Sequence, residues 1–174
     1  MPEPQAEFIN VRNIKAEAIG EPGSRSFRVI VETANSSALM WLEKEQLFQL
    51  AVAVNQLQGN SNVSDEAALF DALMGEDRPE TRVELRVGRL VIGYEENSNR
   101  FIIDVHDVDS EDEDGPTIRI WSNWDQLHDF ADEALVVCAA GRLPCPLCSE
   151  PIDTTGHKCA RSNGHDVHRL SRND

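Results

Sequence analysis

Two segments of the chain repeat apolar residues at the spacing of an amphipathic helix. The later segment has them at i, i+3, i+4, i+7, i+8 and i+11, namely at Leu127, Phe130, Ala131, Ala134, Leu135 and Cys138. The earlier segment has a similar stripe at Leu47, Leu50, Ala51, Val54 and Leu57. We therefore predict two long helices, with Ser122 as the N-cap of the later one and with Gly59 and Gly141 as stop signals.

Short apolar runs bounded by turn residues precede each helix and predict strands. These runs lie at 8–17, 27–31 and 38–41 in the first half and at 83–94, 101–105 and 117–121 in the second. Each half is therefore predicted to be a β-β-β-α unit. The expected fold class is α+β, with antiparallel strands in one sheet or two and both long helices covering the apolar face.

The two strand-to-helix junctions also share a sequence pattern. Both follow W-x4-Q-L-x2-Φ-A, where Φ is apolar, and the pattern starts at Trp41 and again at Trp121. This likeness predicts a duplicated unit, with repeat one at 8–58, repeat two at 82–141 and a connecting stretch at 59–81. Chance similarity stays the alternative, because apolar patterns of this length recur at many such junctions.

The domain organisation follows from these elements. Residues 1–141 are expected to form one main body, in which the connecting stretch holds a short helix at 64–74. Residues 142–165 are expected to form a small appended unit, and residues 166–174 a flexible tail.

The charge of the chain is strongly negative and unevenly distributed. The sequence holds 16 basic and 31 acidic residues, a net charge of −15, and the body before Arg142 accounts for 11 and 27 of them. Such a surface repels phosphate backbones and disfavours nucleic-acid binding. No run approaches the roughly 20 apolar residues of a membrane span, and we expect a cytoplasmic protein whose thiols stay reduced.

Three of the four cysteines and one histidine gather near the C-terminal end. Cys145 and Cys148 have the C-x2-C spacing with which two thiolates bind one tetrahedral zinc. Cys159 supplies a third thiolate, and His157 points to the same side as Cys159 if that segment is extended. The pattern C-x2-C-x8-H-x-C therefore predicts one structural Zn²⁺, which makes residues 142–165 a small zinc knuckle.

Other interpretations of this cluster stay open. His165 and His168 are alternatives for the fourth ligand. A redox site would need a helix that begins at Cys145, which Pro144 and Pro146 oppose. A catalytic zinc keeps an open position for water, whereas closed sites rich in thiolates are structural.

Four stretches of the chain are distinctive: G-E-P-G-S-R-S-F from Gly20, L-E-K-E-Q from Leu42, E-L-R-V-G from Glu84, and A-A-G-R-L-P-C-P-L-C-S-E-P-I-D-T-T-G-H-K-C from Ala139. With them the sequence resembles an uncharacterised bacterial family of unknown function, found in actinobacteria and their relatives. The resemblance implies Cys145, Cys148, His157 and Cys159 as metal ligands, because the place of His165 is usually a tyrosine in that family. It implies no activity.

The run from Asp104 to Pro116 holds seven carboxylates and suggests a cation site. An EF-hand is excluded, because the twelfth loop position would be Trp121 where a bidentate glutamate is required. We expect a solvated acidic loop and leave open whether residues 104–114 bind a cation. Asp104 and His106 share a strand face, but nothing nearby in the sequence supplies a nucleophile.

Three functional hypotheses remain. The first is a non-enzymatic zinc-binding module that presents a rigid loop to a protein partner. The second is an enzyme or small-ligand-binding protein with a pocket between the two repeats. The third is a platform for single-stranded nucleic acid, which the net charge disfavours. Because no convergent catalytic set is visible, the sequence favours a non-enzyme.

Overall fold

The structure is a computed structural model and describes residues 3–57, 80–111, 115–141, 145–148, 152, 157 and 159. These residues form β1 (Ala6–Phe8), β2 (Asn13–Ile19), β3 (Ser26–Glu32), β4 (Ser37–Leu42), α1 (Lys44–Gln56), β5 (Arg82–Glu95), β6 (Arg100–Asp107), β7 (Ile118–Ser122) and α3 (Trp124–Ala139). The predicted helix at 64–74, the stop at Gly59, the tail at 166–174, His165 and His168 lie outside the described residues.

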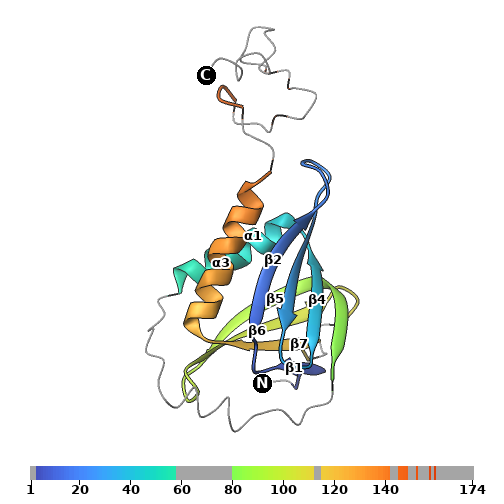
Figure 1. Cartoon of the computed structure of the whole chain (residues 1–174), viewed down its shortest axis with the longest axis vertical. Coiled ribbons are helices and arrows are strands. Elements are labelled where there is room, and N and C mark those ends of the chain that lie inside the picture. Colours follow the sequence, from blue (N-terminus) through green and yellow to red (C-terminus); the bar gives the residue numbers. More distant parts are fainter. Residues whose placement is uncertain are drawn as a thin grey trace.

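All these strands belong to one sheet, in the order β1-β7-β6-β5-β4-β3-β2 (Figure 1). β2, β3 and β4 form an antiparallel meander before α1, and β5, β6 and β7 form a second meander before α3. β4 and β5 run parallel, as do β1 and β7. The predicted β-β-β-α order is therefore present, but the expectation of antiparallel strands throughout is wrong. A helical crossover such as α1 returns the chain to a parallel neighbour.

The sheet curls back on itself. β1 and β2 stand at opposite ends of the strand order, although residues 9–12 are all that separates them along the chain. A connection this short spans less than about 20 Å, so the two edges of the sheet must approach each other. The strand predicted at 8–17 is correspondingly broken into β1 and β2.

The long strand β5 makes a bend of its own between its two neighbours. Its first half pairs with β4 and its second half with β6, with a shift of register between Val87 and Arg89. A Cβ atom on the intervening Gly88 would lie 2.8 Å from the Cα atom of Val108. The close approach of these two backbones therefore requires glycine at position 88.

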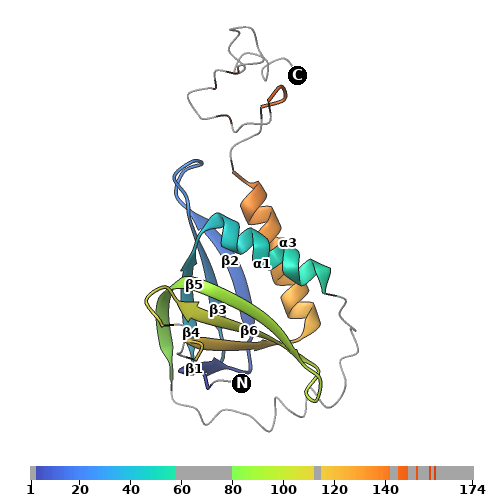
Figure 2. The same cartoon turned by 180° about the vertical axis from the view of Figure 1, so that it is seen from behind.

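One core fills the space between the sheet and the two helices (Figure 2). α1 and α3 pack against each other, and α3 also packs against β2, where the Ala16 N–H donates to the Glu133 carboxylate at 3.0 Å. Each large side chain buried there contributes roughly 1.5–3 kcal/mol. Both predicted helical stripes face this core, and the buried part comprises Leu47, Leu50, Ala51, Val54, Leu127, Phe130, Ala131, Ala134 and Cys138.

A glutamine in the first turn of each helix bonds that helix to a backbone carbonyl from the other half of the chain. The Gln46 side chain donates to the Val87 carbonyl at 3.1 Å, and the Gln126 side chain donates to the Val11 carbonyl at 2.7 Å. Each glutamine also accepts from the N-cap backbone N–H of its own helix. One side chain thus caps the helix and fixes its position on the sheet.

The predicted ends of α3 need correction. Its N-cap is Asn123, whose side chain accepts from the Gln126 N–H, whereas Ser122 ends β7 and is fully buried. α3 ends at Ala139, and Gly141 does not adopt the positive φ of a left-handed helix stop. No helix in the described part of the chain is long and apolar enough to cross a membrane.

Candidate metal centre

Four sulfur and nitrogen atoms converge in the segment that follows α3. The donor atoms of Cys145, Cys148, His157 and Cys159 all lie within 4.8 Å of one another, and Cys148 Sγ is 3.1 Å from His157 Nε2. Zinc–sulfur bonds of about 2.3 Å place tetrahedral ligand atoms nearly 4 Å apart. The four donors therefore fit one ion with small movements, and the structure brings together the four residues that the spacing predicted.

The cysteines in this cluster are partly shielded from solvent. Cys145 is 2% exposed, Cys159 is 4% exposed, and Ile152 packs against them. Burial acts to raise the pKa of Cys145, but backbone N–H groups of Leu147 and Cys148 and the neighbouring thiols lower that pKa to about 7. Donors directed at sulfur stabilise a thiolate, which is the form that binds metal.

The local chain path favours a knuckle over a redox site. Residues 146–148 form a turn after Cys145, and the Leu147 N–H lies 3.5 Å from Cys145 Sγ. A thioredoxin-like site would have a helix beginning at the first cysteine. His165 and His168 lie outside the described residues, so the structure does not place them.

The other sequence candidates are arranged differently. The carboxylate of Asp104 accepts from Arg119 at 2.7 Å, and His106 lies against Arg89 with nitrogen–nitrogen distances of 3.3 and 3.4 Å. His106 is buried, and sequence reasoning missed both arginines because they come from neighbouring strands. Among the described residues, no second group of metal-ligating side chains accompanies the C-terminal cluster.

The acidic loop is described only in part, since residues 112–114 lie outside the described residues. The carboxylate of Asp107 accepts from the Asp109 N–H at 3.0 Å, and the Ser110 hydroxyl donates to the Asp107 carbonyl at 2.7 Å. These contacts are those of a hydrogen-bonded turn. Cation binding by 104–114 stays open.

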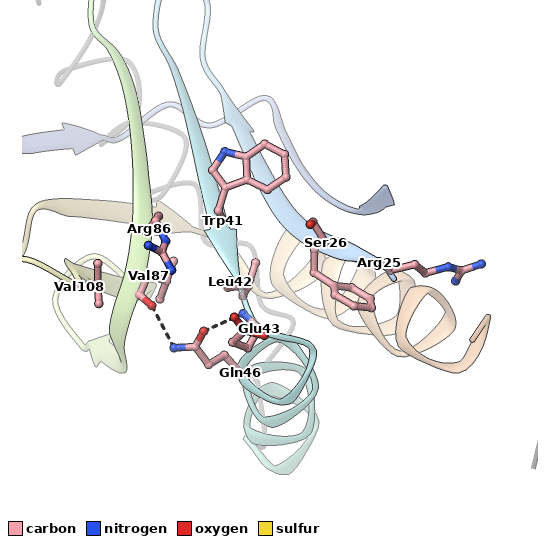
Figure 3. Close-up of a pocket in the computed structure, with 10 residues that line it drawn as sticks. Arg25, Ser26, Trp41, Leu42, Glu43, Gln46, Arg86, Val87 and Val108 are labelled. Carbon is pink, nitrogen blue, oxygen red and sulfur yellow. Dashed lines mark hydrogen bonds between the residues drawn. The ribbon is translucent and has the colours of Figure 1, made fainter. Parts of the chain in front are cut away.

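A cavity of about 320 Å³ lies where β4 ends and α1 begins, beside the bend of β5 (Figure 3). Both halves of the chain contribute to its wall, which includes Arg25, Ser26, Phe27, Trp41, Leu42, Glu43, Gln46, Arg86, Val87 and Val108. Sequence reasoning missed these residues, because their proximity depends on the parallel pairing of β4 with β5.

Fold and cluster together define the class: a mixed α+β protein with a seven-stranded sheet, two helices in its described part and a C-terminal Cys/His cluster arranged to hold a metal ion. The chain belongs to the family described as "Protein of unknown function (DUF3090)", which matches residues 6–159. The match confirms the resemblance to a family of unknown function and reaches Cys159 but not His165. No curated protein and no solved structure matches the chain.

Proposed function

We propose that the chain binds one structural Zn²⁺ through Cys145, Cys148, His157 and Cys159. The observation that carries this proposal is the convergence of their four donor atoms within 4.8 Å. Three thiolates and one imidazole suit zinc better than hard cations, which prefer oxygen ligands. The family match supports His157 as the fourth ligand, because it ends at residue 159, before His165.

The proposed role of the metal is structural. Four protein ligands complete a tetrahedral zinc and leave no position for a water molecule, which a hydrolytic zinc requires. In the described part of this segment, only Ile152 packs against the cysteines. An apolar cluster this small cannot fold the segment by itself. Zinc binding therefore supplies the free energy that orders the segment.

The proposed biochemical role is that of a non-enzymatic, cytoplasmic adaptor that binds a protein partner. Leu147 supports this role: it lies in the turn between Cys145 and Cys148, and its side chain is 40% exposed. A turn held by zinc presents such a leucine with little entropy left to lose on binding.

Zinc content tests the metal proposal directly. We expect native mass spectrometry to find one zinc per chain, and Cys148→Ser to lose it because three ligands remain. Cys138→Ala is the matched control: it removes a buried thiol on α3, outside the cluster, and should keep the zinc. A zinc-free wild-type protein purified from its own cells would contradict the proposal, as would full zinc retention by the serine variant.

We also infer that the two β-β-β-α units arose by duplication. The support is a matching set of contacts at the two parallel junctions. Trp41 Nε1 donates to the Glu84 carboxylate at 2.8 Å, Trp121 Nε1 donates to the Glu7 carboxylate at 3.4 Å, and each first-turn glutamine donates to a backbone carbonyl from the other half of the chain. Matched side-chain contacts at both junctions are hard to ascribe to chance apolar patterns.

A second candidate function is the binding of a small ligand between the two units. The cavity beside β4, β5 and α1 favours it, because its described wall takes residues 25–46 from the first unit and 86–108 from the second. Small-molecule sites are commonly cavities of this size at such internal boundaries. The nucleic-acid alternative stays a prediction that the net charge of −15 disfavours.

A further inference from the structure

The cavity beside β4 and β5 contains an aromatic ring and a guanidinium group in neighbouring positions. Trp41 of β4 and Arg86 of β5 are paired in register across the parallel junction. Their neighbours Met40, Leu42, Leu85 and Val87 are buried in the core, so both side chains stand on the opposite, outer face of the sheet. Figure 3 shows them side by side, with Gln46 below on α1.

Arg86 is the cation in this cavity that has no partner among the described residues. Its guanidinium makes no hydrogen bond or ion pair there and is exposed. Arg25 donates instead to the Ala140 carbonyl at 2.6 Å and extends away from the other side chains in Figure 3. An unpaired arginine in the concave part of a strongly acidic surface marks a place for an anion.

The apolar part of the site comes from the indole ring and the ends of the strands. Trp41 Nε1 donates its hydrogen bond to the Glu84 carboxylate. The indole ring therefore contributes apolar surface to the cavity but no free hydrogen-bond donor. Val108 is 49% exposed at the cavity wall, and Phe27, Leu42 and Val87 contribute the margins of their buried side chains. A ligand that fits must therefore combine an anionic group with an apolar body.

The charges in the described wall distinguish between kinds of anion. Glu43 is its one carboxylate, and it is the N-cap residue of α1. A helix N-terminus attracts negative charge, and Glu43 already supplies that charge here. The Glu43 carboxylate would therefore repel a bound dianion. A monoanion paired with one guanidinium is compatible with this arrangement, whereas a phosphate dianion is not.

We propose that this cavity binds a small organic monocarboxylate, with the carboxylate on the Arg86 guanidinium and the apolar body against Trp41 and Val108. The proposal rests on the ligand-binding candidate function and is independent of the zinc cluster. Arginine holds a carboxylate through two parallel hydrogen bonds, which fixes the orientation of the ligand as well as its charge.

The test is a binding titration followed by amide and indole NMR signals of the zinc-loaded full chain. The probes are phenylacetate, indole-3-acetate and hexanoate, with phenylacetamide as the neutral isostere and phenyl phosphate as the dianion. We expect the carboxylates to shift the signals of Trp41, Arg86 and Val108 with saturation. Arg86→Gln should weaken that binding at least about tenfold, while Arg82→Gln, on the same strand but outside the cavity, should change it less than about twofold.

Each contrary result overturns a defined part of the proposal. Equal binding of phenylacetamide, or undiminished carboxylate binding by Arg86→Gln, would overturn the arginine–carboxylate assignment and leave the ligand-binding function standing. Tighter binding of phenyl phosphate would overturn the choice of a monoanion. If none of the probes shifts these signals, both the assignment and the ligand-binding function fail. Zinc content is measured in every sample, so loss of the knuckle is detected separately.

Discussion

Arg119 and Asp104 form an ion pair that is largely withdrawn from water, with side chains 6% and 15% exposed. Two hydrogen bonds join them, from Arg119 Nε at 2.7 Å and from its Nη2 at 2.8 Å. Hydrogen bonding to Asp104 raises the pKa of Arg119, against the opposing effect of burial. The arginine is therefore held charged where water cannot replace a lost partner.

Removal of one partner from this pair should be strongly destabilising. We expect Asp104→Ala to lower the free energy of unfolding by about 3 kcal/mol in urea titrations, because it removes the two hydrogen bonds and the negative charge that Asp104 provides to a buried guanidinium. Glu80→Ala is the matched control: Glu80 pairs with Arg82 at 2.6 Å, but their side chains are 58% and 80% exposed. The control should lose less than about 1 kcal/mol. Equal losses in the two variants would contradict the argument.

At the scale of elements, the side chains of Gln46 and Gln126 help to position α1 and α3. Each side chain accepts from the N-cap N–H of its own helix and donates to a backbone carbonyl. That carbonyl belongs to Val87 of β5 for Gln46 and to Val11, in the link between β1 and β2, for Gln126. Replacement by alanine should lower the free energy of unfolding by about 1–2 kcal/mol at either position.

Gln49→Ala is the control for this pair of variants. Gln49 lies on the same helix as Gln46, but among the described residues its amide bonds only to the carboxylate of Glu45 on the helix surface, at 2.8 Å. Its loss should cost less than about 0.5 kcal/mol. Urea titrations of the three variants give the comparison. A loss at Gln49 as large as that at Gln46 would show that the contacts across the junction contribute little.

Local patterns predicted the elements of this fold better than their pairing. The apolar stripes of both helices and the meander strands follow from spacings of three or four residues and of two. The break between β1 and β2 does not, because it depends on pairing Ala6 with Ile118 from the other end of the body. The parallel contact of Trp41 with Arg86 is likewise set by the α1 crossover.

The candidate sites divide in the same way. The C-terminal cluster was predictable, because Cys145, Cys148, His157 and Cys159 lie within fifteen residues of sequence and their spacing carries the geometry. The cavity was not predictable, because its wall joins residues far apart in the chain. Asp104 was considered beside His106, its neighbour on the same strand, whereas the structure pairs it with Arg119 on β7.

At the scale of the whole molecule, the described residues form two separate apolar clusters, so we expect the body and the C-terminal segment to be separable. The main cluster draws on strands and helices from Phe8 to Cys138, whereas Cys145 and Cys159 belong to a second cluster. We expect Cys159→Ser, or removal of zinc by a chelator, to abolish amide protection in the C-terminal segment during hydrogen exchange.

The body should keep its fold and its stability when the zinc site is lost. Its far-UV circular dichroism spectrum and its unfolding midpoint should match those of the zinc-loaded wild-type protein, because its core contains none of the cluster residues. Collapse of the helical and strand signal in Cys159→Ser would show that the two parts fold as one.

The curl of the sheet has a consequence for self-association. An open sheet exposes two unpaired borders, each a template onto which another chain can add a strand. In this molecule both borders, β1 and β2, belong to one continuous stretch of chain. The short link at residues 9–12 therefore holds the two borders of the sheet near each other. Loss of the three-residue strand β1 would bare the backbone of β7. The backbone edge of β7 is thus covered by the shortest strand described in the molecule.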